Sequence, residues 1–166
     1  MNEKTDFPYL HGFSNTEQLR LAKQAKFAEY TVYKDINFSE QKNILEVGSG
    51  VGAQTEILLR RFPELKVTGI DRSDKQLETA AKYLQFGGGF EGRYDYQEMD
   101  ATDMEFEGEK FDGAFLCWVL EHIPSPAKVL SEVRRVLKPG SPVFVTEVLN
   151  SSFFIALFIS STISSF

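Results

Sequence analysis

The sequence NILEVGSGVGA, residues 43–53, joins a short apolar segment to a turn rich in glycine. Residues 43–47 are apolar enough for a buried strand, and Gly48 ends it. The following glycines permit a tight turn and let a ligand approach the backbone closely. A helix is expected over residues 53–62, where Pro63 stops it. This segment therefore predicts a strand, a ligand-binding turn and a helix in succession.

The alternation of strands and helices continues along the chain. Further strands are expected over residues 66–70, 94–99, 111–117 and 142–148, and helices over 14–33, 73–87 and 125–137. Apolar residues fall on roughly helical spacing in the first and last of these helices: Leu19, Ala22, Phe27 and Tyr30, then Leu130, Val133 and Leu137. Such alternation predicts a doubly wound, Rossmann-like parallel sheet with helices on both faces, an α/β/α sandwich.

Length, charge and cysteine content exclude several classes of protein. One domain is expected from 166 residues, and the net charge of −6 shows no basic stripe, so we expect no nucleic-acid partner. The single Cys117 cannot form an internal disulfide, and one Cys with two His does not make a standard zinc site. Neither a signal peptide nor a membrane-spanning segment is expected, which favours the cytoplasm.

Acidic residues near the strand ends point to a particular ligand. Asp71 lies 21 residues after Gly50, where a carboxylate at the end of the second strand would bind a ribose diol. This spacing alone fits NAD, FAD and other ribose-bearing ligands. Glu46 would repel a diphosphate and would suit a cationic ligand without phosphate, such as S-adenosylmethionine. The alternative interpretation is that Glu46 pairs with a nearby Lys or caps a turn.

Five segments together resemble class I S-adenosylmethionine-dependent methyltransferases of the small-molecule type. They are residues 44–52, 67–73, 99–101, 111–122 and 137–140, in the family's order and at its separations. The resemblance covers roughly residues 40–148. It implies S-adenosylmethionine as cofactor and a small molecule as methyl acceptor. A nicotinamide oxidoreductase is the competing enzyme, and Glu46 with the Asp100-Ala101 turn argues against it.

The resemblance also implies roles for individual residues. The turn at Gly48, Ser49 and Gly50, with Glu46 beside it, would face the methionine part of the cofactor. The remaining assignments are Asp71 at the ribose, Arg72 beside the adenine, Asp100 and Ala101 at the adenine edge, and the Cys117 carbonyl with Trp118 near the methyl group. Residues 1–40 would form a helical lid that brings Tyr9 and Gln24 to the cofactor, and residues 41–150 the cofactor-binding domain. An ordinary amphipathic helix on the sheet is the alternative for the lid.

Three side chains near the fourth strand have competing interpretations. His122 is the candidate general base, because it follows the fourth strand on the ligand side and histidine titrates near neutrality; a structural hydrogen bond is the alternative, favoured over it. Trp118 could stack on a ligand or belong to the core. Cys117 lacks an evident activating partner, so it is read as a buried strand residue rather than a nucleophile. Asp112 begins its strand and is read as structural.

The end of the chain departs from the family pattern, which has two more strands after the fifth. Residues 151–166 form an apolar tail without charge, which suggests truncation or a frameshift; packing of the tail as a makeshift edge strand or helix is the alternative. An exposed fifth strand and this tail would favour self-association. A cofactor-binding remnant without catalysis, or an interaction protein of the same fold, is therefore the alternative function.

Overall fold

The computed structural model describes residues 15–149, 154–155 and 161–162, with side chains for residue 23 and residues 25–147. The elements are α1 (Asn15–Tyr33), β1 (Asn43–Val47), α2 (Ala53–Arg61), β2 (Lys66–Asp71), α3 (Asp74–Gly87), β3 (Tyr94–Glu98), β4 (Gly113–Cys117), the 3-10 turn η1 (Leu120–His122), α4 (Pro126–Val136), β5 (Pro142–Thr146), β6 (Val148–Leu149), β7 (Phe154–Ile155) and β8 (Ser161–Thr162). Every strand and helix expected between residues 14 and 148 is present, with bounds shifted by two residues at most.

The five expected strands form one parallel sheet in the order β3-β2-β1-β4-β5. The chain moves outward from β1 through β2 to β3 and then returns to place β4 on the other side of β1. Ligands of such sheets bind beyond the carboxyl ends of the strands at this change of direction. The doubly wound α/β fold is confirmed, and the carboxyl ends of β1 and β4 are where a ligand site is expected.

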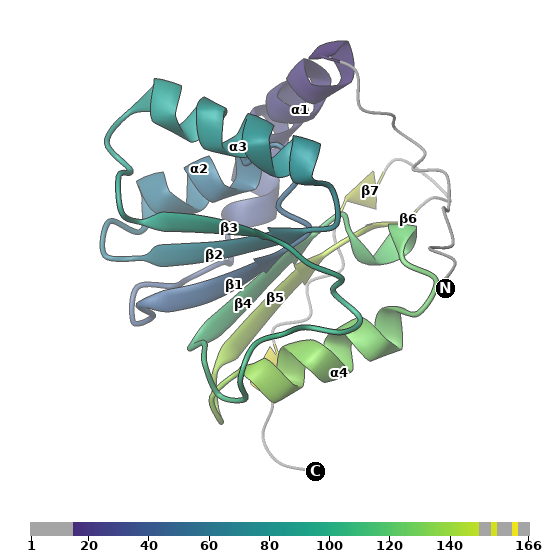
Figure 1. Cartoon of the computed structure of the whole chain (residues 1–166). Helices are drawn as coiled ribbons and strands as arrows, with labels where there is room; N and C mark the ends of the chain where they lie inside the picture. Colours follow the sequence, from purple (N-terminus) through teal and green to yellow (C-terminus); the bar gives the residue numbers. More distant parts are fainter. Residues whose placement is uncertain (1–14, 150–153, 156–160, 163–166) are drawn as a thin grey trace.

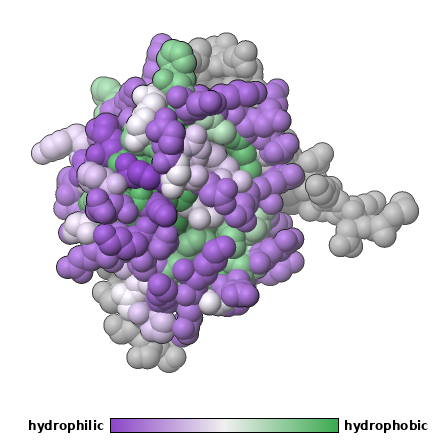
Figure 2. Space-filling model, turned by 60° about the vertical axis from the view of Figure 1, so that its left-hand side comes forward, coloured by the Kyte–Doolittle hydropathy of each residue, from purple (hydrophilic) through white to green (hydrophobic). Residues whose placement is uncertain are grey.

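Helices cover both faces of the sheet (Figure 1). Helices α1, α2 and α3 lie on one face and α4 on the other, and each layer has its own buried cluster. Hydrophilic residues dominate the face in Figure 2, with smaller hydrophobic areas between them. The described residues contain no helix long and apolar enough to cross a membrane.

The expected face of α1 is wrong at Phe27 and Tyr30, and that of α4 is wrong at Leu130. Phe27 and Tyr30 of α1 are 92% and 85% exposed, whereas Ala25 and Ala28 are buried. The small alanine side chains let α1 pack closely against α2, so the aromatic residues face outward. In α4, Leu130 is 41% exposed. Val133 and Leu137 are buried as expected. Val129 and Val136 complete the buried face of α4 with Val133, at intervals of four and three residues.

Part of the tail covers the outer edge of β5. Ser161 and Thr162 of β8 pair antiparallel with Val143 and Pro142. A second short pair joins β6 to β7. The expectation that the tail forms a makeshift edge strand agrees with this pairing at residues 161–162, while most of the tail lies outside the described residues. This pairing reduces the exposed edge of β5 at its start.

Candidate functional site

The glycine turn after β1 is hydrogen-bonded to the neighbouring strand β2. The backbone N–H groups of Gly48 and Ser49 both donate to the Ile70 carbonyl, at 2.8 and 3.0 Å. Gly48, Gly50 and Gly52 all have positive φ, at 71°, 51° and 78°. Residues with a side chain rarely adopt this conformation, so the backbone path of the turn depends on glycine.

Gly48 is also required sterically, and this can be tested against Gly50. A Cβ at Gly48 would lie 2.4 Å from Val119 Cγ2, whereas a Cβ at Gly50 would meet nothing closer than 4.0 Å. We expect Gly48→Ala to lower the free energy of unfolding by about 2–4 kcal/mol, from left-handed strain plus overpacking. Gly50→Ala carries only the strain and should cost about 1 kcal/mol. Urea unfolding of both variants measures the difference, and equal losses would contradict the steric argument.

Asp71, at the end of β2, connects the glycine turn with α3. Its Oδ2 accepts from the Gly50 N–H and its Oδ1 from the Ser73 N–H, both at 3.0 Å. Burial raises the pKa of Asp71, and the two backbone donors oppose that rise. Each carboxylate oxygen has a second lone pair. The side chain can therefore hold the turn and still accept hydrogen bonds from a ligand.

The turn offers few donors to an anion. The N–H groups of Gly48, Ser49 and Gly50 are bonded to protein oxygens, and the Gly52 N–H donates to the Ser49 carbonyl. Dinucleotide-binding turns instead direct such N–H groups at the diphosphate of the ligand. This geometry fits a nucleoside without phosphate better than NAD or FAD.

A pocket of about 390 Å³ opens beside the turn, at the carboxyl ends of β1, β2 and β4. Eight of the expected site residues line it: Gly48, Gly50, Asp71, Arg72, Asp100, Ala101, Trp118 and His122. Thr102 and Lys128 also line it and were not expected. Glu46, Ser49 and Cys117 do not contribute to its wall. The Gln24 side chain and all of Tyr9 lie outside the described residues.

Beyond β3, Asp100 forms a small turn at the rim of the pocket. Its Oδ1 accepts from the backbone N–H and from the hydroxyl of Thr102, at 2.7 and 2.8 Å. The Asp100 side chain is exposed. This arrangement fixes the carboxylate beside Ala101, where its second oxygen is available to a donor such as an adenine amino group.

The loop after β4 has an unusual backbone. Trp118 has a φ of 56°, and its N–H donates to the Thr146 carbonyl at 2.8 Å. Its indole Nε1 is buried and has no hydrogen-bond partner within the described part of the chain. A positive φ in a bulky residue stores strain, and such strain is frequent at ligand sites. Trp118 both lines the pocket and packs against the buried cluster beneath α1 and α2, so the two readings of this residue do not exclude each other.

Glu147, directly after β5, holds this loop and was not expected to matter. Its Oε1 accepts from the N–H groups of Leu120 and Val119, at 2.8 and 3.2 Å. Burial raises the pKa of Glu147. An acidic residue at or just after the end of a parallel strand is the same signal that identified Asp71 at the end of β2. The connection of Glu147 to Val119 appears only once β5 lies beside β4.

Removal of the Glu147 carboxylate should loosen the loop. Glu147→Ala leaves two backbone N–H groups without their acceptor, and we expect a loss of about 2–3 kcal/mol in the free energy of unfolding. Glu105→Ala, at an exposed glutamate in the loop between β3 and β4, should change the free energy of unfolding by less than about 0.5 kcal/mol. Chemical denaturation compares the two variants, and a loss at Glu147 no larger than that at Glu105 would contradict the assigned role.

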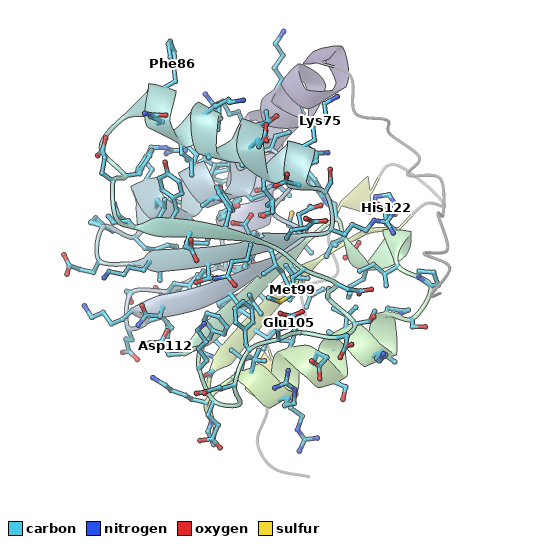
Figure 3. All side chains as sticks on the ribbon, viewed as in Figure 1. Lys75, Phe86, Met99, Glu105, Asp112 and His122 are labelled. Carbon is cyan, nitrogen blue, oxygen red and sulfur yellow. The ribbon has the colours of Figure 1, made fainter. Side chains whose placement is uncertain are left out.

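His122 and Cys117 differ in their access to the pocket. His122 lies in η1 on the carboxyl-end side of the sheet, far from Asp112, as Figure 3 shows, and its side chain is 13% exposed. Its Nε2 lies 3.6 Å from Glu121 Oε1. Cys117 packs against the buried cluster, and burial raises the pKa of its thiol. Cys117 is therefore not activated as a nucleophile.

Asp112 is structural, as expected. Its carboxylate accepts from the N–H groups of Lys42 and Asn43 at the start of β1. This contact lies at the amino ends of the strands, opposite the pocket (Figure 3). Asp112 therefore supports the sheet without approaching the site.

Glu46 lies behind the pocket wall rather than in it. It is 2% exposed, and its Oε2 accepts from the Thr55 hydroxyl of α2, which in turn accepts from the Tyr96 hydroxyl at 2.8 Å. Burial raises the pKa of Glu46 to about 8. Among the described residues, no lysine pairs with the Glu46 carboxylate, and the carboxylate caps no turn. Its hydrogen-bond partner there is the Thr55 hydroxyl.

Comparison with known proteins identifies one family. The pattern of the family described as "Methyltransferase domain" matches residues 45–145. The chain is 31% identical over 112 residues to a sterol 24-C-methyltransferase of Candida albicans, covering 68% of this chain and 29% of that protein. It is 32% identical over 108 residues to a demethylmenaquinone methyltransferase of Thermotoga maritima, covering 65% and 44%. This chain thus spans less than half the length of either relative.

A solved structure shows the same fold. The SAM dependent methyltransferase from Aquifex aeolicus superimposes with a TM-score of 0.68 at 18% identity, covering 82% of this chain and 73% of that one. At this identity the match concerns the fold alone. It agrees with the parallel sheet of this chain.

Proposed function

Because this chain belongs to the methyltransferase domain family, we propose that it binds S-adenosylmethionine beside the glycine turn and transfers the methyl group to a small molecule. The family implies this cofactor. The observation that carries the proposal is the bonding of the turn. The N–H groups of Gly48, Ser49, Gly50 and Gly52 are occupied by protein oxygens, while Asp71 presents a carboxylate to the pocket. Such a site favours a ribose and a positive charge over a diphosphate.

The expected contacts follow from the pocket wall. We assign the ribose hydroxyls to Asp71 and the adenine to the rim formed by Arg72, Asp100 and Ala101. The methionine part would lie along the turn from Gly48 through Ser49 to Gly50, with the Cys117 carbonyl and Trp118 near the methyl group. We keep residues 1–40 as the proposed lid, with Tyr9 and Gln24 toward the cofactor, 41–150 as the binding domain and 151–166 as the tail.

The protein's contribution to the reaction is mainly geometric. When bound, S-adenosylmethionine would supply a methyl group activated by a positively charged sulfur: the acceptor would bond to the methyl carbon as the carbon–sulfur bond breaks, and a neutral thioether would leave. The chain must hold the two reactants in line and exclude water, which the fastened turn and the Glu147-held loop favour. Where the acceptor is a hydroxyl or an amine, His122 is the group in the pocket wall that could take its proton.

A small-molecule acceptor agrees with the names of the relatives, which act on a sterol and on demethylmenaquinone.

We place the protein in the cytoplasm and expect no nucleic-acid or membrane partner. Self-association through the tail and the outer edge of β5 is also proposed, and sedimentation of the full chain at several concentrations tests it.

Calorimetric titration with S-adenosylmethionine, S-adenosylhomocysteine and NAD tests the proposal. We expect the first two to bind and NAD not to bind. Binding of NAD alone would overturn the proposed function in favour of an oxidoreductase. A screen of acceptors for methyl transfer then separates an enzyme from a chain that only binds the cofactor.

A further inference from the structure

Among the residues that the structure describes, the buried carboxylate of Glu46 has no cation beside it. The titratable groups around it come from four elements and are all acids: Tyr33 of α1, Asp71 of β2, Tyr96 of β3 and Cys117 of β4. From α2 it receives only the neutral hydroxyl of Thr55. Among the described residues, no Lys, Arg or His contributes to its environment. A fully buried carboxylate is normally paired with a cation, so this one lacks its usual partner.

Glu46 is nevertheless close to the pocket. It lies two residues before Gly48, which lines the pocket, and its charge interacts with that of Asp71, which lines it as well. The side chain is 2% exposed, so little water screens it. A charge placed in the pocket therefore acts on Glu46 through a region of low dielectric.

We propose that Glu46 determines the selectivity of the site for the charge of the cofactor: it is ionised when the methylsulfonium is present and protonated when the neutral demethylated product remains. This inference rests on the proposed function. Transfer of the methyl group to a hydroxyl or amine removes the positive charge from sulfur and releases one proton overall. Glu46 takes up one proton from solvent in the product complex, which leaves no unpaired buried charge behind.

The proton exchange has a defined direction with pH. Burial raises the pKa of Glu46 to about 8, so a pocket without a cation favours the protonated form at neutral pH. A cation in the pocket favours the ionised form. Binding of S-adenosylmethionine must then release a proton below pH 8, and its affinity relative to S-adenosylhomocysteine must rise with pH.

Calorimetry over pH 6–8.5, in two buffers of different ionisation enthalpy, measures both quantities. The dissociation constant of S-adenosylhomocysteine divided by that of S-adenosylmethionine should increase by about 10- to 100-fold across this range. Sinefungin, in which an amine replaces the methylsulfonium, should behave like S-adenosylmethionine. In Glu46→Gln the ratio should follow only the titration of the ligands themselves. Glu64→Gln, at an exposed carboxylate, should behave like the unmodified protein.

A second variant, Thr55→Val, tests the inference without removing the Glu46 carboxylate. Thr55→Val removes the hydroxyl that stabilises ionised Glu46, so the rise in the ratio should move to higher pH. The inference is overturned if both ligands bind and their ratio shows the same pH dependence with and without Glu46. Failure of every ligand to bind at any pH would instead overturn the proposed function, and this inference with it.

Discussion

Asp71→Ala should weaken S-adenosylmethionine binding by about 100-fold or more. Each hydrogen bond to a charged acceptor contributes about 1.5–3 kcal/mol, and the ribose diol would lose two of them. The substitution also removes the acceptor that fixes the Gly50 and Ser73 N–H groups. The turn itself would therefore become less ordered. Calorimetric titration of the folded variant measures the loss of binding.

Asp112→Ala is the matched control for this experiment. Asp112 also accepts from two backbone N–H groups, those of Lys42 and Asn43, but at the opposite end of the sheet. Both substitutions should lower the free energy of unfolding by about 2–4 kcal/mol, whereas only Asp71→Ala should affect binding. Equal weakening of binding in the two variants would show that Asp71 acts through stability alone.

The second large effect concerns the stability of the fold as a function of pH. The pKa of Glu46 rises from 4.5 to about 8 on folding, so between these values the folded protein holds a proton that the unfolded chain has released. The contribution of Glu46 to the free energy of unfolding is fully present below pH 4.5, and it is lost as the pH rises toward 8. The loss amounts to about 1.4 kcal/mol for each pH unit, or about 5 kcal/mol in total.

Comparison with Glu46→Gln isolates this contribution. Glutamine has nearly the same shape and does not ionise, so the variant should gain stability relative to the unmodified protein as the pH rises from 5 to 8. Burial also raises the pKa values of Asp71 and Glu147. Both groups remain in the variant, so Glu147 cancels in the difference, and Asp71 cancels apart from its charge interaction with Glu46. Urea unfolding at each pH measures this difference. A difference that does not change with pH would show that Glu46 is ionised throughout.

Several features of the site depend on contacts that no local pattern encodes. Glu147 holds the N–H groups of Val119 and Leu120 only because β5 pairs with β4. Gly48 is confined by Val119, which lies 71 residues later in the chain. Glu46 was expected at the ligand, but its bond to Thr55 places the carboxylate behind the wall of the pocket.

Local sequence was sufficient for the order and the bounds of the strands and helices. The strand at 43–47 and the helix that Ser73 caps are examples. Apolar runs, glycines, prolines and capping residues act over a few neighbouring positions, so their effect can be read from the chain. The tertiary structure alone decided which face of α1 is buried, where the Glu46 carboxylate lies and that Thr102 and Lys128 join the expected residues in the pocket. These depend on side-chain size and strand order across the whole sheet, where packing outweighs local preference.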